Sequence, residues 1–223
     1  MTDASLLFSA HLPMTQGENP TIAAFLQEGE RYSLVSINET DDTDFDRHVM
    51  GRIAALVKVI SRRTIGDGAA LLRSRLIFSG GGANAWSLAR RLAPTFKAGD
   101  YDVVEITAGG RAACRVHAIP LHGVPKPVSQ VPRLIFIGAL QDLAAPGQDR
   151  IGTELDPKEM EALRAEAVTF EERARKMPTD DPAALMDFQG DGRMVALGIG
   201  VWSILYGRES VNAVTPGAEP GNR

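Results

Sequence analysis

Residues 75–86 read Arg75-Leu76-Ile77-Phe78-Ser79-Gly80-Gly81-Gly82-Ala83-Asn84-Ala85-Trp86, a short apolar run followed by three consecutive glycines. The run Leu76 to Phe78 is too short for a helix and has the length of a buried parallel strand. The glycines let the backbone turn sharply or approach another group closely. Apolar residues then recur at helical spacing, at Ala85, Leu88, Ala89, Leu92 and Phe96. A strand, a glycine turn and a helix in this order can present backbone N–H groups to a phosphate or a nucleotide.

The composition is that of an ordinary globular protein. Of the 223 residues, 44% are hydrophobic and 23% are charged, which suffices for a sizeable core. The net charge of −4 argues against a general binder of nucleic acid or of anionic membranes. The single cysteine, Cys114, excludes a disulfide within this chain and a cysteine-rich zinc site.

Two further features bear on localisation. No basic segment precedes the first apolar residues, so a secretory signal is not expected. The longest apolar run, Met194 to Tyr206, is shorter than the ~20 residues that a membrane-spanning helix needs. We therefore expect a soluble, cytoplasmic protein with no membrane partner.

Short apolar runs closed by turn residues predict strands at Arg31 to Asn38, at Leu76 to Phe78 and at Arg133 to Ile137. Glycines 109 and 110 separate two further strand-like runs, which predicts a β-hairpin over Val103 to Ile119 at an edge of the sheet. A short strand at Ser5 to Ala10 and a helical turn at Ile22 to Leu26 complete the first half. The fold class expected is α/β, with a mixed sheet, packed helices and an edge β-hairpin.

Three helices are predicted from periodicity and end signals. Apolar residues from Phe45 to Ile60 fall on one helical face, after an acidic cluster and before basic residues. Asp156 and Pro157 are a helix N-cap and first-turn residue, and an apolar seam runs from Met160 to Met177. The run Met194 to Tyr206 is apolar all round, which predicts a helix packed on several sides.

The organisation expected along the chain has three parts. Residues 1–150 form an α/β core that contains the glycine-rich turn. Residues 151–210 form a helical segment that packs on the core or on a partner. Residues 211–223 are polar and rich in proline and glycine, which predicts a flexible tail.

Few side chains have the spacing of a catalytic or metal site. Asp42, Asp44 and Asp46 resemble the start of a calcium loop, but Arg47 and Ile53 stand where its glycine and closing acid are needed. They are interpreted as helix-capping acids, with one Mg²⁺ carboxylate among them as the alternative. No metal site is expected, and Cys114 is interpreted as a buried, inert thiol. The four histidines, interpreted as surface or loop residues, are His11, His48, His117 and His122.

Three segments together resemble the C-terminal lobe of the actin/Hsp70/sugar-kinase ATPases. They are Asp44 to Arg47 before one helix, Leu76 to Ala83 before another, and Met194 to Gly200 within a small-residue helix. The resemblance implies ATP or ADP with Mg²⁺ as the cofactor. It also implies that the turn contacts the nucleotide, through Gly80, Gly81, Gly82 and Ala83, with Asn84 adjoining them. The family's Asp-x-Gly-Thr phosphate loop is absent from the chain.

Two function classes follow. The first is a degenerate or partial ATPase-like lobe that acts as an assembly or interaction protein and binds a nucleotide without hydrolysing it. The second is a nucleotide-dependent enzyme, an ATPase or kinase-like protein, with catalytic loops that the sequence does not reveal; its catalytic residues are unknown. The narrow Met160–Met177 seam predicts a protein partner or a homo-oligomer through this helix, and packing on the chain's own core is the competing interpretation.

Overall fold

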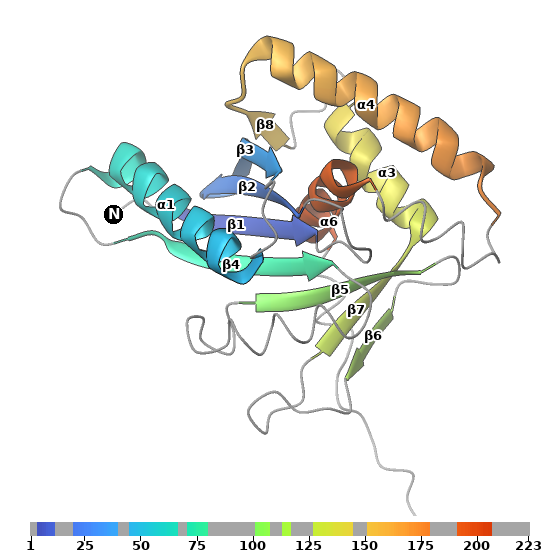
Figure 1. The fold of residues 1–223 in the computed structure, drawn as a ribbon, viewed down its shortest axis with the longest axis horizontal. Coiled ribbons are helices and arrows are strands. Elements are labelled where there is room, and N and C mark those ends of the chain that lie inside the picture. The colour runs from blue at the N-terminus through green and yellow to red at the C-terminus, as the bar shows by residue number, and fades with distance from the viewer. Residues whose placement is uncertain are drawn as a thin grey trace, which may run out of the picture.

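The computed structural model describes residues 4–11, 20–39, 45–66, 71–79, 101–107, 113–116, 127–144, 151–178 and 191–206. Its strands are β1 (Ala4–His11), β2 (Thr21–Glu28), β3 (Arg31–Glu39), β4 (Arg73–Ser79), β5 (Tyr101–Thr107), β6 (Ala113–Val116), β7 (Pro127–Pro132) and β8 (Ile151–Thr153). Its helices are α1 (Phe45–Ile65), α3 (Arg133–Ala144), α4 (Pro157–Lys176) and α6 (Gly192–Leu205). Figure 1 shows these elements around one twisted sheet.

The strands form a mixed sheet in the order β6-β7-β5-β4-β1-β2-β3-β8. Strands β1, β2 and β3 are an antiparallel meander, and Gly29 adopts a positive φ of 61° in the tight turn between β2 and β3. Strand β4 returns beside β1 in parallel, and β5 and β7 extend the sheet in the same direction. This topology confirms the predicted α/β class and its mixed sheet.

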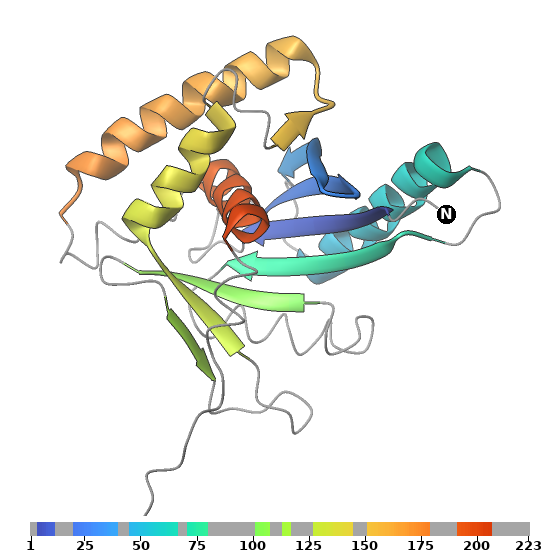
Figure 2. The same cartoon turned by 180° about the vertical axis from the view of Figure 1, so that it is seen from behind.

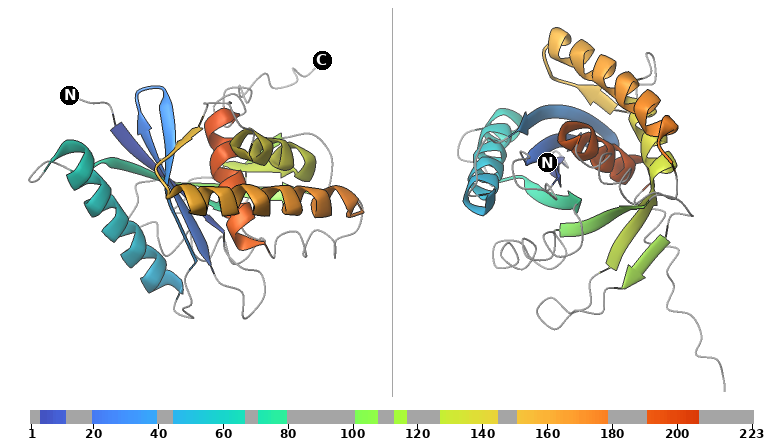
Figure 3. Two further views of the ribbon diagram at one scale, coloured as in Figure 1. Left: turned by 90° about the horizontal axis from the view of Figure 1, so that it is seen from above. Right: turned by 45° about the vertical axis from the view of Figure 1, so that its right-hand side comes forward.

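Helices cover both faces of the sheet, as Figures 2 and 3 show. Helix α1 buries Ile53, Val57 and Ile60 against one face. Helices α3, α4 and α6 pack on the other face, where they share a single apolar core with side chains from β1 to β5, β7 and β8. Since side chains alternate along a strand, the odd-numbered residues of β1, β2 and β4 point towards α6 and the even-numbered ones towards α1.

Helix α6 approaches the meander so closely that a side chain larger than glycine does not fit at Gly200. A Cβ atom there would lie 2.3 Å from Cε2 of Phe25 and 2.7 Å from Oγ of Ser9. The Ser9 hydroxyl also donates a hydrogen bond of 2.7 Å to the carbonyl of Ala196. The small residues noted in the sequence therefore allow α6 to lie directly on β1 and β2.

The three predicted helices are confirmed in type and approximate extent. Helix α4 begins as expected, because the Asp156 carboxylate accepts a hydrogen bond of 2.8 Å from the backbone N–H of Lys158 and Pro157 stands in the first turn. None of the helices in the described residues has the length and apolar character needed to cross a membrane. Strand β8 pairs with β3, and α6 packs on β1 and β2, so residues on both sides of position 150 share one sheet and one core.

Two short segments have a different secondary structure from the one predicted. Residues Arg133 to Ile137 begin helix α3 instead of forming a strand, and Gly138 lies inside this helix. Residues Ile22 to Leu26 belong to β2 instead of a helical turn. Neither segment shows a clear apolar–polar period in its sequence, and such short apolar runs do not distinguish a strand from a helix.

The predicted β-hairpin over Val103 to Ile119 is also wrong. Strands β5 and β6 exist, but β7 lies between them and pairs with both. Strand β6 does lie at an edge of the sheet. The Gly-Gly signal is local and carries no information about a strand inserted from later in the chain.

Candidate functional site

The candidate site lies at the edge of the sheet where four strands end. Strand β1 is parallel to β4, β4 to β5, and β5 to β7, so their carboxyl ends lie at one edge. In open α/β sheets, ligands bind outside the carboxyl ends of the parallel strands. A binding site is therefore expected at this edge.

A row of polar residues crosses the sheet at this edge. The strand register pairs Glu39 of β3 with Thr21 of β2, Thr21 with His11 of β1, and His11 with Ser79 of β4. Partners in register point to the same face, and here it is the face covered by α6. Thr21, His11 and Ser79 are almost completely buried. Three polar side chains thus occupy positions where an apolar core is expected.

His11 and Ser79 form a hydrogen bond with each other. Their Nδ1 and Oγ atoms are 2.9 Å apart, and the direction of the bond depends on the tautomer of the imidazole. With the proton on Nδ1, the imidazole donates and the serine hydroxyl keeps its own proton for another acceptor. With the proton on Nε2, Nδ1 accepts from the hydroxyl and can draw the proton away from it. Only the first arrangement leaves the serine proton free to donate to an oxygen atom of a ligand, whereas the second leaves the serine oxygen with lone pairs alone.

The hydroxyl of Thr21 adds a buried polar atom with no partner. Its Oγ1 atom has no hydrogen-bond partner among the described residues, although the side chain is buried. A buried hydroxyl without a partner is unfavourable by about 1–3 kcal/mol. By contrast, Ser9 on the same face of β1 is satisfied by the carbonyl of Ala196.

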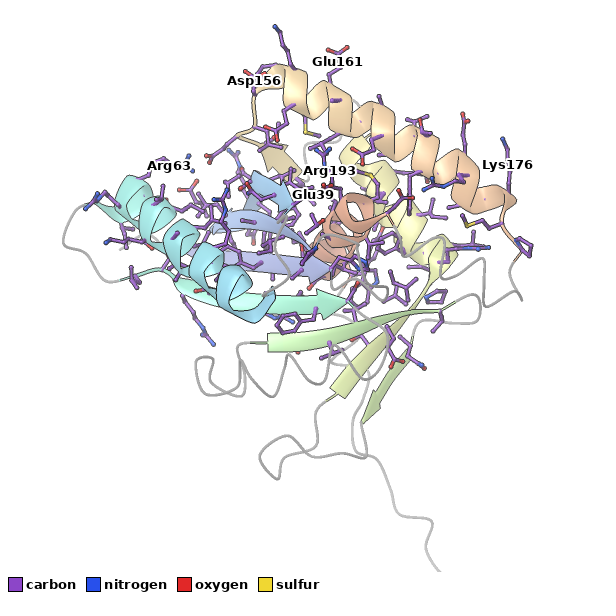
Figure 4. The ribbon with its side chains drawn as sticks, in the orientation of Figure 1. Glu39, Arg63, Asp156, Glu161, Lys176 and Arg193 are labelled. Carbon is purple, nitrogen blue, oxygen red and sulfur yellow. The ribbon has the colours of Figure 1, made fainter. Side chains whose placement is uncertain are left out.

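Charged side chains gather at the beginning of α6, next to this row. Arg193 lies 3.3 Å from a carboxylate oxygen of Glu166 on α4 and 3.9 Å from one of Glu39, and Figure 4 shows Arg193 beside Glu39. Arg173 of α4 forms an ion pair with Asp191, the residue before α6. Burial raises the pKa of Glu166 above its ordinary value; the nearby charge of Arg193 opposes this shift and that of Glu39 adds to it.

The predicted nucleotide-contacting residues, Gly80 to Asn84, lie outside the described residues. Ser79, the last residue before them, is at the carboxyl edge of β4. The acids Asp42 and Asp44 and the histidines His117 and His122 also lie outside the described residues, and Cys114 lies in β6 with a side chain that is not described. The predicted turn therefore begins at this edge of the sheet, directly after Ser79.

The interpretation of His11 as a surface or loop residue is wrong, because His11 is a buried strand residue. The sequence did contain a signal for its position. Ser5, Ser9 and His11 share one face of β1 with Leu7, and the other face holds only Leu6, Phe8 and Ala10 and is therefore the more apolar of the two. What the sequence lacked was the parallel register that brings Ser79 beside His11.

Within the described part of the chain, no group of three or more metal-ligating side chains lies together. A small cavity of about 80 Å³ lies at the opposite, amino end of β1, lined by Ser5, Leu6, Leu7, Gln27, Tyr32, Arg75, Ser203 and Ile204. Ligand pockets in proteins usually measure roughly 300–1,000 Å³. This cavity is too small for a nucleotide.

Comparisons with known proteins show no family for this chain. No protein-family model matches the chain, and no curated protein matches it. Among solved structures, the human cytomegalovirus terminase nuclease domain matches with a TM-score of 0.45 and 10% identity over 90% of this chain and 84% of that one. A structure of this domain described as Mn-soaked and inhibitor-bound matches with a TM-score of 0.42 and 11% identity, over 85% and 86% of the two chains. Likeness at this level carries no argument about activity.

The resemblance to the actin/Hsp70/sugar-kinase ATPases is wrong. The solved structures that match are nuclease domains, and no family model supports the ATPase assignment. The three segments behind the resemblance are a helix start, a strand followed by glycines, and a small-residue helix, each of which occurs in many α/β proteins. Their combination therefore had little power to identify one family.

Proposed function

We propose that this chain is a binding and interaction protein that holds a phosphate-bearing ligand at the carboxyl edge of β1 and β4 and does not hydrolyse it. A nucleotide such as ADP or ATP is the first candidate, with Mg²⁺ bound to the nucleotide phosphates. The observation that carries the proposal is the buried hydrogen bond of 2.9 Å between His11 and Ser79, one residue before the three glycines.

This pair suits an anionic ligand for a chemical reason. When Nδ1 of His11 carries the proton, it donates to Oγ of Ser79, and the serine hydroxyl is then oriented to donate to an oxygen beyond it. The glycine sequence that follows provides backbone N–H groups without side chains, which are typical of phosphate-binding turns. A core position with no ligand role would be filled more favourably by apolar side chains.

The distance of 2.9 Å between Nδ1 of His11 and Oγ of Ser79 also supports the second candidate, a nucleotide-dependent enzyme. A nucleophile and a base function within about 2.6–3.2 Å of each other, and Ser79 and His11 meet this requirement. The binding proposal is preferred because the sequence lacks the phosphate loops that position a nucleotide for transfer. An assay for both binding and turnover separates the two.

The experiment is a thermal-shift titration with ADP and ATP, with and without Mg²⁺, alongside an assay for released phosphate. A ligand at 100 times its Kd stabilises a two-state fold by about 2.7 kcal/mol, which corresponds to several degrees in Tm. Ser79→Ala and Gly81→Val should remove the shift. Ser61→Ala is the matched control, because Ser61 is also buried and accepts a hydrogen bond of 2.9 Å from the N–H of Leu72, on the α1 side of the sheet.

Three outcomes are distinguishable. A shift that depends on Ser79, without phosphate release, supports the binding proposal. Phosphate release that Ser79→Ala abolishes would favour the enzyme. Absence of any shift with the wild-type protein, or a shift equal in all variants, would contradict a ligand site at this edge.

We propose that a partner protein, or a second copy of this chain, binds to the outer face of α4. The apolar seam from Met160 to Ala174 is buried in the chain's own core, so a partner of this helix has to contact the opposite face. Val168 is half exposed there. Sedimentation of the wild-type protein and of Val168→Asp tests this: a change from oligomer to monomer supports an interface on this face, and an unchanged species contradicts it.

A further inference from the structure

Arg133 is a buried arginine at the junction between β7 and α3. Strand β7 ends at Pro132 and helix α3 begins at Arg133, so no loop separates the two elements. The arginine is 1% exposed and is the largest of the fully buried side chains. Arginines are almost never buried to this extent unless the guanidinium is paired.

The contacts of this guanidinium satisfy only part of it. Nη2 donates a hydrogen bond of 2.8 Å to the carbonyl of Met177, and Nη1 donates one of 3.2 Å to the carbonyl of Pro178. These contacts tie Arg133 to the backbone just after α4. The Nε atom is buried, and among the described residues it has no hydrogen-bond partner and Arg133 has no carboxylate partner.

A positive charge in this position is strongly unfavourable unless an anion accompanies it. A guanidinium carries its charge at every pH at which proteins fold, so it cannot become neutral to relieve the cost. Two carbonyl dipoles compensate part of that charge. The remaining Nε–H donor and the remaining charge call for an anionic acceptor.

The first turn of α3, which begins at Arg133 itself, adds positive potential on the same residue's backbone side. The N–H groups of a first helical turn have no partner within the helix, and the helix dipole is equivalent to about half a positive charge there. No acidic side chain occupies the first turn of α3. A helix N-terminus with a buried guanidinium as its first residue combines the two features that bind phosphate groups.

The location agrees with the candidate site. Strand β7 runs parallel to β5, and β5 parallel to β4, so Arg133 follows the carboxyl end of β7 at the same edge of the sheet as Ser79 and His11. Val131, two residues before Arg133, belongs to the core on the α6 face, which is also the face of His11 and Ser79.

We infer that Arg133 and the N-terminal turn of α3 bind a phosphate group, either inorganic phosphate or the phosphate of a phosphomonoester or nucleotide. The inference rests on the proposed function in assigning a phosphate-bearing ligand to this edge, and it supplies the cationic residue that His11 and Ser79 do not provide. Arg133 holds the anion through Nε–H while Nη1 and Nη2 remain on the two carbonyls.

The test uses inorganic phosphate as the probe and the full chain. Phosphate should raise the Tm in a saturable manner, measured against sodium chloride at equal ionic strength, and the ³¹P resonance should broaden or shift on addition of protein. Arg133→Gln should weaken phosphate binding by at least about tenfold, the loss expected for removing a charged hydrogen-bond donor. Arg175→Gln is the matched control, because Arg175 is an exposed arginine near the end of α4.

Arg133→Lys is a second variant, which keeps the test decisive if Arg133→Gln does not fold. It keeps the charge but loses the planar set of donors, so it should fold and should also bind phosphate more weakly than the wild type. The ³¹P measurement on the wild-type protein needs no variant. If phosphate gives no saturable effect on the wild type, the inference is overturned, and Arg133 only ties α3 to the end of α4.

Failure of this inference and failure of the proposed function give different results. A phosphate effect that depends on Arg133 but not on Ser79 would establish the α3 site and leave no role for the His11–Ser79 pair. A nucleotide effect that depends on Ser79, with equal affinity in Arg133→Lys, would support the proposed function and overturn the role of Arg133. Loss of the nucleotide effect in both Ser79→Ala and Arg133→Lys supports both.

Discussion

Gly198 of α6 lies directly against the aromatic ring of Phe136 of α3. A Cβ atom on this glycine would be 2.2 Å from Cζ of the ring and 2.5 Å from Cε2. Phe136 is fully buried, and its ring packs edge-on against Phe170 of α4 with the centroids 6.4 Å apart. The absence of a side chain at Gly198 therefore sets how closely α3 and α6 approach each other.

Gly198→Ala should destabilise the protein, because the methyl group would displace a ring that is held on its other side by Phe170. Overpacking of this kind costs about 1–3 kcal/mol, which urea unfolding followed by circular dichroism can measure. Gly51→Ala in α1 is the control: a Cβ there has no neighbour within 4 Å, so this change should stabilise by roughly 0.5–1 kcal/mol. Equal effects of the two changes would show that the helices can move apart at no cost.

The seam of α4 provides a second prediction. Leu163 is 1% exposed and Phe170 is 2% exposed, so Leu163→Asp together with Phe170→Asp should place two unpaired charges in the core. We expect the free energy of unfolding to fall by several kcal/mol without a change in oligomeric state. Val168→Asp on the outer face, at 50% exposure, should leave stability nearly unchanged. Dissociation of an oligomer at constant Tm in the double variant would instead place the seam in an interface.

The sequence predicted those elements whose signals are local. Helix α4 was predicted because Asp156, Pro157 and the apolar seam each act within a few residues of one another. Strand β2 was missed because it is buried on both faces, so its sequence shows no alternation of apolar and polar residues. Helix α3 was missed for a related reason, since its apolar content has no clear period and begins directly after a strand.

The candidate site was predictable only in part. Ser79 stands beside the glycines that the sequence singled out, and β4 does end there. The partner of Ser79 is His11, 68 positions away, and only the parallel register of β1 and β4 brings them together. The polar row and the buried Arg133 both depend on tertiary structure, which no local pattern encodes.

The unpartnered hydroxyl of Thr21 leads to a third prediction. Thr21→Val keeps the shape of the side chain and removes the unsatisfied oxygen, so it should raise the free energy of unfolding by about 1 kcal/mol. Ser9→Ala on the same face should lower it by roughly 0.5–1.5 kcal/mol, because the Ser9 hydroxyl is bonded to the carbonyl of Ala196. Denaturant unfolding of the wild type and both variants measures these changes in the free energy of unfolding. A loss of stability in Thr21→Val would mean that the hydroxyl has a partner in solution.

The last prediction concerns pH and Glu166. Burial raises the pKa of this carboxyl above its ordinary value of 4.5; Arg193 works against the shift and Glu39 adds to it. In the pH window between 4.5 and the raised pKa, the folded protein therefore binds more protons at Glu166 than the unfolded chain does. The contribution of Glu166 to the free energy of unfolding is then greatest below this window and falls as the pH rises through it.

Glu166→Gln removes this titration, so the stability of the wild type relative to the variant should decline as the pH rises above 4.5 and become constant once the wild-type carboxyl is ionised in both states. Thermal unfolding of both proteins from pH 4 to pH 8, in steps of about half a unit, measures the difference. Glu161→Gln, on the exposed side of the same helix, controls for the loss of a surface charge. Glu39→Gln should narrow the pH range over which this decline occurs, because the charge of Glu39 is one cause of the raised pKa of Glu166. A relative stability that instead increases with pH would show that the attraction of Arg193, 3.3 Å from the Glu166 carboxylate, outweighs its burial.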